Sequence, residues 1–376
     1  MHRPRIALVG PSRPYQGGIA DHTVELAARL RERGQLAEHA GWGRQFPARF
    51  ASLTPQLPAE HAAHANDSRS EAQPAQGATT RELHWNSPQS WKRVGRRLAE
   101  LSSHLVIVVS SPLQLPAIRT LSKTLRSRGH QRKQVTLIVH NVLPHEPRQW
   151  DSALMRVVLR TADRVLIHST EQRKLAEHLG AKRAVSVALP FHPPDGMTAA
   201  SHKAGERRMG TIGFFGTIRP YKGVKQLIEA VSRLPEIRLI VEGQFWEPLD
   251  DYVALATRLG VSHRVELRPR FATSEQIQGL LGEIDALVLP YRSATASQQP
   301  SVAFMRGVPV IASDTGDLRS TLRDDVDGIV IGGLGVDAIA RAIQRFYEQH
   351  RWLRLRQNVS PPDPDQEWDS YLAALT

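Results

Sequence analysis

The sequence predicts an α/β protein with two doubly wound parallel sheets, and three observations lead to this prediction. Short β-branched or leucine-rich runs recur along the chain, and stretches with helical periodicity separate them. This alternation stops at the Pro-, Gly- and Ala-containing stretch LPFHPPDGMTAASHKAGERR and then starts again, which places the division between the domains near residues 195–207. The length of 376 residues, of which 41% are hydrophobic and 23% charged, suits two globular domains of ordinary size.

Five apolar runs predict the strands of the first domain, at residues 1–195. They read RIALVG, LVIVVSS, VTLIVHN, RVLIHS and AVSVAL. Parallel strands that are buried on both faces are expected to be continuously apolar, as these are. The helical pattern between them is clearest in ADHTVELAARLRERG at residues 20–34. Within this domain, residues 55–80 have low complexity and predict a surface loop.

Six further runs predict the strands of a second domain, at residues 208–350. They read TIGFFG, IRLIVEG, RVELRPR, ALVLPY, VPVIAS and GIVIGG. Residues 351–376 form a C-terminal segment, in which PPDPDQEWDSYLAALT breaks at its prolines and then resumes a helical pattern. Strands that alternate with helices indicate a doubly wound sheet in each domain.

Composition and missing motifs exclude several classes of site. The chain has no cysteine, so disulfides, zinc–thiolate sites and a cysteine nucleophile are excluded. It has no P-loop motif, no HExxH and no GxGxxG directly after a strand, which leaves nucleotide hydrolysis at a P-loop, zincin proteolysis and dinucleotide binding without support. Two Asp-x-Asp spacings, at 325–327 and 363–365, do not follow an apolar strand, so we expect turn residues there and no metal site.

The apolar runs also bear on the cellular location. The opening MHRPRIALVGPS has too short an apolar run for a signal peptide and is expected to be a first strand. No run approaches the roughly 18 apolar residues that a membrane-spanning helix needs. We therefore expect a cytoplasmic protein.

The positive charge is concentrated in one half of the chain. Residues 1–190 contain 28 Lys and Arg against 14 Asp and Glu, and residues 191–376 contain 21 against 23, which gives the formal net charge of +12. Such asymmetry favours an anionic partner, for example a membrane surface or a phosphorylated substrate, unless the arginines only solvate helix faces. Nucleic acid is not expected as a partner, because only 6% of the residues are aromatic and no recognition motif is present.

One basic stretch, SWKRVGRRLAEL at residues 90–101, allows two interpretations. Cations and apolar residues share it, as in a helix that lies at a membrane interface. The other interpretation is a solvated helix packed on the sheet. The residues concerned are Lys92, Arg93, Arg96 and Arg97 beside Trp91, Val94, Leu98 and Leu101.

Four stretches with candidate ligand-binding residues each follow a predicted strand, and the carboxyl ends of strands are where open α/β sheets bind ligands. In VGPSRPYQGGIADHT, Gly17 and Gly18 precede a helix, where glycine allows close approach of a ligand and free N–H groups favour phosphate. The alternative is an ordinary turn. His140 ends VTLIVHN and can donate to a sugar hydroxyl or a phosphate oxygen, or cap its own loop.

The third stretch, GFFGTIRPYKGVKQLIEAV, carries Arg219 and Lys222 in a tight loop between a strand and a helix. Two cations from one loop suit a diphosphate, one as a planar fork and one as a point charge. Solvation at the surface is the alternative.

The fourth stretch is a hydroxyl- and amide-rich tract at residues 293–301 that contains no acid. Ser297 is predicted to cap the next helix, with Pro300 in its first turn. Hydroxyls from Ser293, Thr295 and Ser297 then lie beside unpaired backbone N–H groups, which makes an anion site without a formal charge.

The ordered motifs GGI, HN, RPYKG, VEG, LPYRSAT and GVPVIASDTGDL resemble those of the retaining GT-B glycosyltransferases of family 4, and most closely a bacterial branch of it. The resemblance runs from Arg5 to about Tyr347. It implies two Rossmann-like domains that face a central cleft, the first for the acceptor and the second for a nucleotide-diphosphate sugar. It also implies a terminal helix that crosses back to the first domain, and catalysis without a metal or another cofactor.

Carried over by position, the resemblance implies a role for each motif residue. His140 is expected beside the transferred sugar, Lys222 at the diphosphate, and Arg219 in place of the family arginine, whose own position is Thr217. These three form the implied catalytic set. The other implied contacts are donor contacts of Gly17, Gly18, Thr217, Gln244, Thr295, Ser297 and Gln298, and acceptor contacts of Asp21 and His22.

The chain departs from the family pattern at its acids. The two glutamates eight positions apart fall on Ala294 and Val302, and a glycine of the bacterial branch falls on Gln298. Retaining transfer still remains the expected reaction, because the leaving diphosphate can itself take the acceptor proton. The alternative is a GT-B protein that makes a non-glycosidic coupling or only binds sugar nucleotides.

Overall fold

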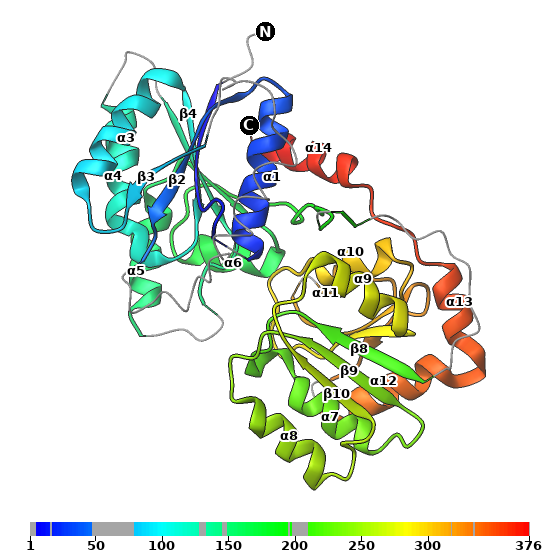
Figure 1. Cartoon of the computed structure of the whole chain (residues 1–376). Helices are drawn as coiled ribbons and strands as arrows, with labels where there is room; N and C mark the ends of the chain where they lie inside the picture. The colour runs from blue at the N-terminus through cyan, green and yellow to red at the C-terminus, as the bar shows by residue number, and fades with distance from the viewer. Residues whose placement is uncertain are drawn as a thin grey trace. The chain divides into compact units, whose positions relative to one another are not determined.

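The computed structural model describes residues 5–15, 17–46, 79–127, 133–144, 149–194, 196–197, 210–316, 318–333 and 335–375. The chain divides into two compact units (Figure 1). Unit 1 contains Met1–Ala188 and Trp368–Thr376, and unit 2 contains Leu189–Glu367. Nearly all of the loop predicted at 55–80, and most of the connection at 195–207, lie outside the described residues.

Unit 1 contains a sheet of seven parallel strands in the order β3-β2-β1-β4-β5-β6-β7. Its strands are β1 (Ile6–Val9), β2 (Leu36–Arg44), β3 (Thr79–His84), β4 (His104–Val109), β5 (Gln134–Val139), β6 (Arg164–Ile167) and β7 (Ala184–Ser186). The sequence prediction missed β2 and β3. In β2, LAEHAGWGR mixes polar and apolar residues, and the strand forms because Ala40 and Trp42 are buried against β3 and its neighbours.

Helices cover both faces of this sheet. They are α1 (Gly18–Glu32), α3 (Pro88–Leu101), α4 (Leu115–Arg126), α5 (Asp151–Arg160), α6 (Thr170–His178) and the end of α14 (Pro364–Leu375), with the short turn η2 (Pro112–Gln114). Figure 1 shows α3 and α4 on one side of the strands, and α1 and α14 on the other. Adjacent strand residues point to opposite faces, so Ile107 packs with α3 and α4 whereas Val106 packs with α1 and residues 368–375.

Unit 2 contains a second parallel sheet, in the order β10-β9-β8-β11-β12-β13. All six predicted runs form its strands: β8 (Thr211–Phe215), β9 (Arg238–Gly243), β10 (Val265–Pro269), β11 (Ala286–Leu289), β12 (Val310–Ser313) and β13 (Gly328–Ile331). Its helices are η3 (Pro220–Lys222), α7 (Val224–Ser232), α8 (Leu249–Arg258), α9 (Ser274–Glu283), α10 (Gln299–Met305), α11 (Leu318–Thr321), α12 (Val336–Tyr347), η4 (Glu348–His350) and α13 (Arg351–Gln357). Two parallel α/β sheets confirm the predicted fold class.

The two Asp-x-Asp pairs have local structural roles. Asp325 forms ion pairs with Arg351 at 3.1 Å and with Arg354 at 2.8 Å, and Asp327 forms one with Arg323 at 2.6 Å. Asp363 caps the start of α14, because the backbone N–H groups of residues 365 and 366 donate to its carboxylate at 3.1 Å. These contacts agree with the prediction of turn residues.

Three buried histidines of unit 1 should make folding sensitive to acid. Burial is the main cause that lowers the pKa of His39, His104 and His168 from 6.5 to about 4. The unfolded chain therefore takes up protons at a higher pH than the folded chain does. As the pH falls from 6.5 towards 4, the free energy of unfolding decreases, by about 1.4 kcal/mol per histidine at pH 5.5.

Urea unfolding followed by tryptophan fluorescence at pH 7.5 and 5.5 measures this loss. His104 contacts the Thr136 hydroxyl at 2.8 Å, and His104→Gln retains a polar partner for it but cannot titrate. This variant should lose about one third of the pH dependence. Equal stability of the parent protein at the two pH values would contradict the assignment.

Candidate functional site

The glycine pair of unit 1 lies at an open helix start. Gly17 is the N-cap of α1 and has φ +107°, a backbone conformation that favours glycine. A Cβ built on Gly17 or on Gly18 meets no atom within 4 Å. Gly17 supplies no side chain to cap this 15-residue helix, and the N–H groups of Ala20 and Asp21 donate to the Gly17 carbonyl, so only the N–H groups before Ala20 remain for a ligand. This geometry suits a ligand with negative charge.

His140 lies at the carboxyl end of β5 in a cluster of three histidines. Its ring centroid is 4.7 Å from that of His168 and 4.9 Å from that of His22. His140 is only 7% exposed. Two aromatic residues of α14 complete the cluster: the Trp368 ring stacks on His22 at 5.5 Å, and the Tyr371 ring stacks on His168 at 5.9 Å.

The two predicted acceptor contacts, Asp21 and His22, differ in their exposure to solvent. Asp21 lies in the first turn of α1, is partly exposed and forms an ion pair with Arg13 at 3.4 Å. His22 has no exposed surface, because α14 covers it within unit 1. The His22 imidazole is thus enclosed in this conformation, and its acceptor contact stays a prediction. Its position next to His140 gives it a packing role.

In unit 2, a short loop after β8 carries both predicted cations. Arg219 precedes the turn η3, and its guanidinium stacks 3.6 Å from the centre of the Trp246 ring. Gly223 then starts α7 with φ +72°, and a Cβ there would lie 2.1 Å from the Pro290 carbonyl oxygen. Only glycine allows the loop to pack this closely against the end of β11.

Lys222 lies beside aromatic rings and has no counter-charge among the described residues. Its Nζ lies 5.1 Å from the centre of the Tyr291 ring, and no hydrogen bond or ion pair to another described residue holds it. Burial, with a smaller contribution from the charge of Arg219, lowers the pKa of Lys222 to about 8. By contrast, Lys225 pairs with Glu247 at 2.9 Å and with Asp251 at 3.3 Å.

Gln299 connects the tract at residues 293–301, which follows β11, to the end of β8 near Lys222. Gln299 accepts a hydrogen bond from Ser297 Oγ at 3.0 Å and another from the Tyr291 hydroxyl, and its Nε2 donates to the Phe215 carbonyl. A Cβ placed on Gly216 would lie 2.7 Å from Gln299 Nε2 and 3.8 Å from Lys222 Nζ. The end of β8, the tract and the lysine therefore meet at one point.

The helix start in this tract differs from the prediction. The N-cap of α10 is Gln298, and Ser297 lies one position earlier with its Oγ 3.4 Å from the Gln299 N–H. The Gln298 side chain accepts from His192 N at 3.4 Å and donates to Pro190 O at 3.1 Å. Gln298 is thus engaged by residues 190–192, and its amide is not free for a donor in this conformation. Ser297 instead bonds to the backbone and the side chain of Gln299, the first residue of the helix.

The remaining predicted donor contacts lie at the same edge of the sheet. Thr217 directly follows Gly216 and is partly buried, whereas Gln244 follows β9 and is exposed. The Gln244 carbonyl accepts from Ile218 N at 2.8 Å, which joins the two loops. Thr295 lies in the tract after β11 and is partly buried. Unit 2 therefore brings its predicted residues to one edge, and the unit 1 residues form a second group.

Three contributors to this site escaped the sequence prediction. Trp246 holds Arg219, while Tyr291 and Gln299 border Lys222. Tyr291 belongs to the LPYRSAT motif and Gln299 to the amide-rich tract at 293–301, so sequence signals for both exist, but no local pattern marks Trp246. A pocket of about 200 Å³ also opens beside Arg219, and its lining includes Arg292, Glu247 and Tyr252.

The positions of the two family glutamates cannot supply acid chemistry. Val302 is 5% exposed and belongs to the core of unit 2, and Ala294 packs against that core. No cluster of three or more His, Cys, Asp or Glu residues that could hold a metal ion occurs in the described part of the chain. In the same part of the chain, no helix is long and apolar enough to cross a membrane.

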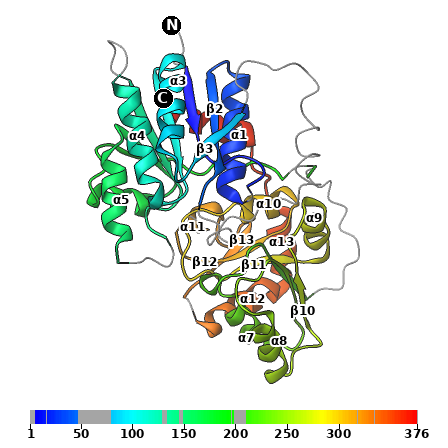
Figure 2. The same cartoon turned by 60° about the vertical axis from the view of Figure 1, so that its left-hand side comes forward.

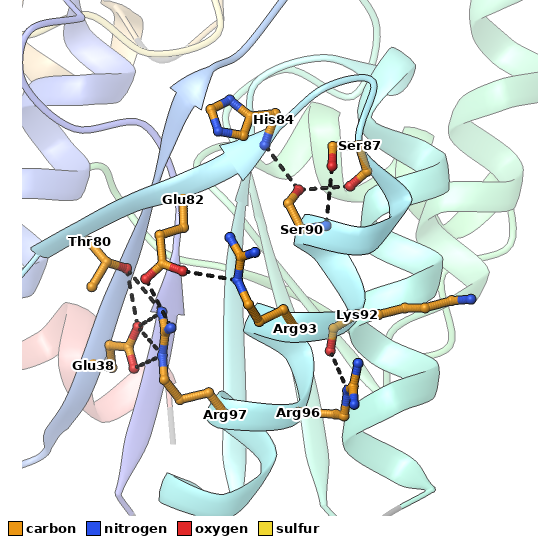
Figure 3. Close-up of polar contacts among 10 residues, drawn as sticks. All are labelled: Glu38, Thr80, Glu82, His84, Ser87, Ser90, Lys92, Arg93, Arg96 and Arg97. Carbon is orange, nitrogen blue, oxygen red and sulfur yellow. Dashed lines mark hydrogen bonds and ion pairs between the residues drawn. The ribbon is translucent and has the colours of Figure 1, made fainter.

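The predicted interfacial helix is α3, and its apolar side is not available to a membrane. Ser87 caps it, and Trp91, Val94 and Leu98 are buried in the core of unit 1. Figure 3 shows two of its arginines turned towards acids. Arg93 contacts Glu82 at 3.3 Å, and Arg97 contacts Glu38 at 2.7 Å and Glu82 at 2.9 Å. The contacts favour the alternative interpretation, a solvated helix packed on the sheet.

Comparison with known proteins gives a family match in unit 2. Residues 202–361 match the family described as "Glycosyl transferases group 1", which is less than half of the chain. A D-inositol 3-phosphate glycosyltransferase of Mycobacterium marinum is 27% identical over 198 residues, and one of Mycolicibacterium smegmatis is 26% identical over 205 residues. Each match covers 50% of this chain, and 42% and 47% of the respective relative.

Solved structures resemble the chain over almost its full length. Anabaena Alr3699/HepE in complex with UDP and glucose has a TM-score of 0.68 at 15% identity, covering 99% of this chain and 97% of that one. Sucrose-phosphate synthase from Thermosynechococcus elongatus has a TM-score of 0.65 at 16% identity, covering 99% and 96%. The chain therefore has the two-domain fold of the GT-B glycosyltransferases, with a segment similar to the group 1 family in its second unit.

Proposed function

We propose that this protein is a retaining glycosyltransferase that moves a sugar from a nucleotide-diphosphate sugar to an acceptor. The matched family and the similar mycobacterial proteins are glycosyltransferases by name, which supports this reaction class. Structures of HepE were solved with UDP and with UDP-glucose, which supports a donor of this chemical type. The candidate site residues and the family 4 motifs described above are part of the proposal.

The observation that carries the proposal is the uncompensated ammonium of Lys222. A partly buried cation without a carboxylate is costly unless an anion binds to it. Lys222 lies where a strand ends and beside a tract of hydroxyls and amides, and the nearby guanidinium of Arg219 is held by Trp246. These groups together can bind the two phosphates of a nucleotide sugar.

The proposed chemistry needs no metal and no carboxylate base. The bond between the sugar C1 and the β-phosphate oxygen breaks, and an acceptor oxygen bonds to C1 on the same face of the sugar. The acceptor proton passes to the leaving diphosphate. Lys222 and Arg219 stabilise the negative charge that develops on this diphosphate, and His140 donates a hydrogen bond to a sugar hydroxyl.

A second candidate function is binding or non-glycosidic coupling of sugar nucleotides. The apolar side chains at Ala294 and Val302 favour it, because they remove both acids of the family pattern. Slow hydrolysis of the donor without an acceptor separates the two functions. A glycosyltransferase should release free sugar and nucleoside diphosphate, whereas a protein that only binds the donor should release neither.

The acceptor is proposed to be a polysaccharide, a glycolipid or a precursor of a secondary metabolite, in the cytoplasm or at the inner face of a membrane. The excess of cations in residues 1–190 supports an acceptor that is anionic or lies at an anionic surface.

A thermal-shift panel with UDP-, GDP-, ADP- and dTDP-sugars tests the proposed donor class directly. A ligand that binds the native state raises its melting temperature by mass action. At a concentration 100 times its dissociation constant, the true donor should stabilise the protein by about 2.7 kcal/mol. No shift with any nucleotide sugar would contradict both candidate functions.

Lys222→Ala should weaken binding of the donor found by the panel about 10–100-fold, because it removes a charge-assisted contact worth about 1.5–3 kcal/mol. Turnover should fall about 10²–10³-fold, as when one preorganised donor to a developing negative charge is removed. Titration calorimetry and release of the nucleoside diphosphate measure the two effects.

Lys225→Ala is the matched control, because the ammonium of Lys225 is already neutralised by Glu247 and Asp251. Its donor affinity should stay within about threefold of the parent protein, since its charge is already compensated and partly exposed ion pairs contribute little. Parent-like affinity in Lys222→Ala would remove the diphosphate assignment.

Donor binding should also weaken at alkaline pH. With its pKa at about 8, Lys222 is charged at pH 7 and mostly neutral at pH 9 in the free protein. Above pH 8, binding must take up a proton, so the dissociation constant for the nucleoside diphosphate should rise nearly tenfold per pH unit, or about 1.4 kcal/mol. Calorimetry between pH 7 and 9.5 gives this profile.

Lys222→Arg keeps its charge over this whole range, because the arginine pKa is above about 12. Its binding profile should be flat with pH, whatever its absolute affinity. The same alkaline decline in the arginine variant would show that another group causes it.

A further inference from the structure

The helices α4 and α5 present a surface of cations without exposed acids. Their sequences contain five basic residues and one acid, Asp151, which is 7% exposed. Arg126 is paired with Asp163 at 2.9 Å. The other four cations are exposed, and none has a hydrogen bond or ion pair to another described residue. They are Arg119, Lys123, Arg156 and Arg160.

Large apolar side chains are exposed on the same two helices and at their start. Leu113 in η2 is 54% exposed, Trp150 directly before α5 is 56% exposed, and Val157 on α5 is 40% exposed. The two segments are close, because η2, α4 and α5 contact one another. Exposed tryptophan, leucine and valine near arginines that have no partner in the described part of the chain match the composition of a membrane interface.

The cations of α4 lie on one outer surface of unit 1, which borders the end of α5. Arg119, Lys123 and Arg126 recur every three or four residues, so they share a side of α4. Together with Thr161 at the end of α5 they border a hollow of about 640 Å³. Arg126 also donates to the Thr161 carbonyl at 3.0 Å. Figure 2 shows α4 and α5 side by side.

The inner sides of both helices are already committed to the core. Leu121 and Leu125 of α4, and Met155 and Val158 of α5, are buried against the sheet. The outer side has no such partner among the described residues. The exposed cations and apolar side chains of α4 and α5 can therefore contact a partner while both helices stay packed on the sheet.

We propose that the outer surface of α4 and α5, with Leu113 and Trp150 at its end, docks on an anionic phospholipid bilayer. The cations bind lipid phosphates, and the exposed apolar side chains enter the headgroup region. This surface replaces α3 as the membrane contact. It refines the proposed location at a membrane and does not require the transfer reaction.

The apolar part of the surface argues for lipid over nucleic acid as the partner. Four cations alone suit any polyanion. The exposed side chains of Leu113 and Val157 gain from a hydrophobic medium, which a bilayer supplies and a nucleic acid backbone does not. The docking surface therefore combines the two kinds of contact that hold peripheral proteins at membranes.

Co-sedimentation with vesicles tests the proposal on the full chain. One set of vesicles contains phosphatidylcholine only, and the other contains phosphatidylcholine with about 30% phosphatidylserine. Both sets are measured at low and at physiological salt. The protein should bind the anionic vesicles and not the neutral ones. Because each cation near the surface contributes about a factor of five in binding, Arg119→Ala/Lys123→Ala should weaken binding about thirtyfold.

Two control pairs make the result specific. Arg258→Ala/Arg341→Ala removes the same charge from exposed positions of α8 and α12, and should bind vesicles like the parent protein. Trp150→Ala/Leu113→Ala should weaken binding without changing the charge. Thermal shift with the nucleotide-sugar donor should be unchanged in all variants, which separates this proposal from the proposed enzyme activity.

Three results would overturn the proposal. The first is no binding to anionic vesicles at low salt. The second is equal loss in the α4 pair and in the pair from unit 2, which would show a general charge effect. The third is normal vesicle binding by the Arg119→Ala/Lys123→Ala variant. If that variant binds vesicles normally but binds a random-sequence RNA more weakly, the cations serve a nucleic acid and the proposal is overturned.

Discussion

Both sheets are parallel and buried on both faces, and this constraint decides where polar groups of the protein can act. Each inner strand satisfies its backbone within the sheet and hides its side chains under helices, whereas the edge strands β3, β7 and β10 are partly exposed. The loops at the strand ends are therefore where the sheets themselves can present groups to a small ligand. The glycine loop before α1, His140 and the loop with Arg219 and Lys222 all follow strands for this reason.

The same constraint explains the last turns of the chain. Helices α3 to α6 cover one face of the unit 1 sheet, and α1 covers only part of the other. Trp368, Tyr371, Leu372 and Leu375 fill the remainder of that face, so the end of the chain belongs to unit 1 although unit 2 precedes it. In this position Trp368 and Tyr371 also pack on the histidine cluster around His140.

Lys222 and α3 show how similar residues acquire different roles from their surroundings. The cations Arg93 and Arg97 have acidic neighbours on β2 and β3, which neutralise them. Lys225 has Glu247 and Asp251. Lys222 has aromatic rings, a glutamine and a second cation around it, so its charge is left for a ligand. Charge without compensation, rather than charge itself, distinguishes a candidate site.

The sequence by itself determined the fold class, eleven of the strands and the order of the strand-end motifs, because apolar periodicity and glycine placement are local signals. It did not reveal β2 and β3, whose mixed composition becomes a strand only through burial against neighbours. Nor could it show that His22 is buried, that Gln298 is held by residues 190–192, or that four cations of α4 and α5 have no partner among the described residues. Those facts depend on contacts between residues far apart in the chain, and only the tertiary structure decides which polar groups meet a partner and which remain for a ligand.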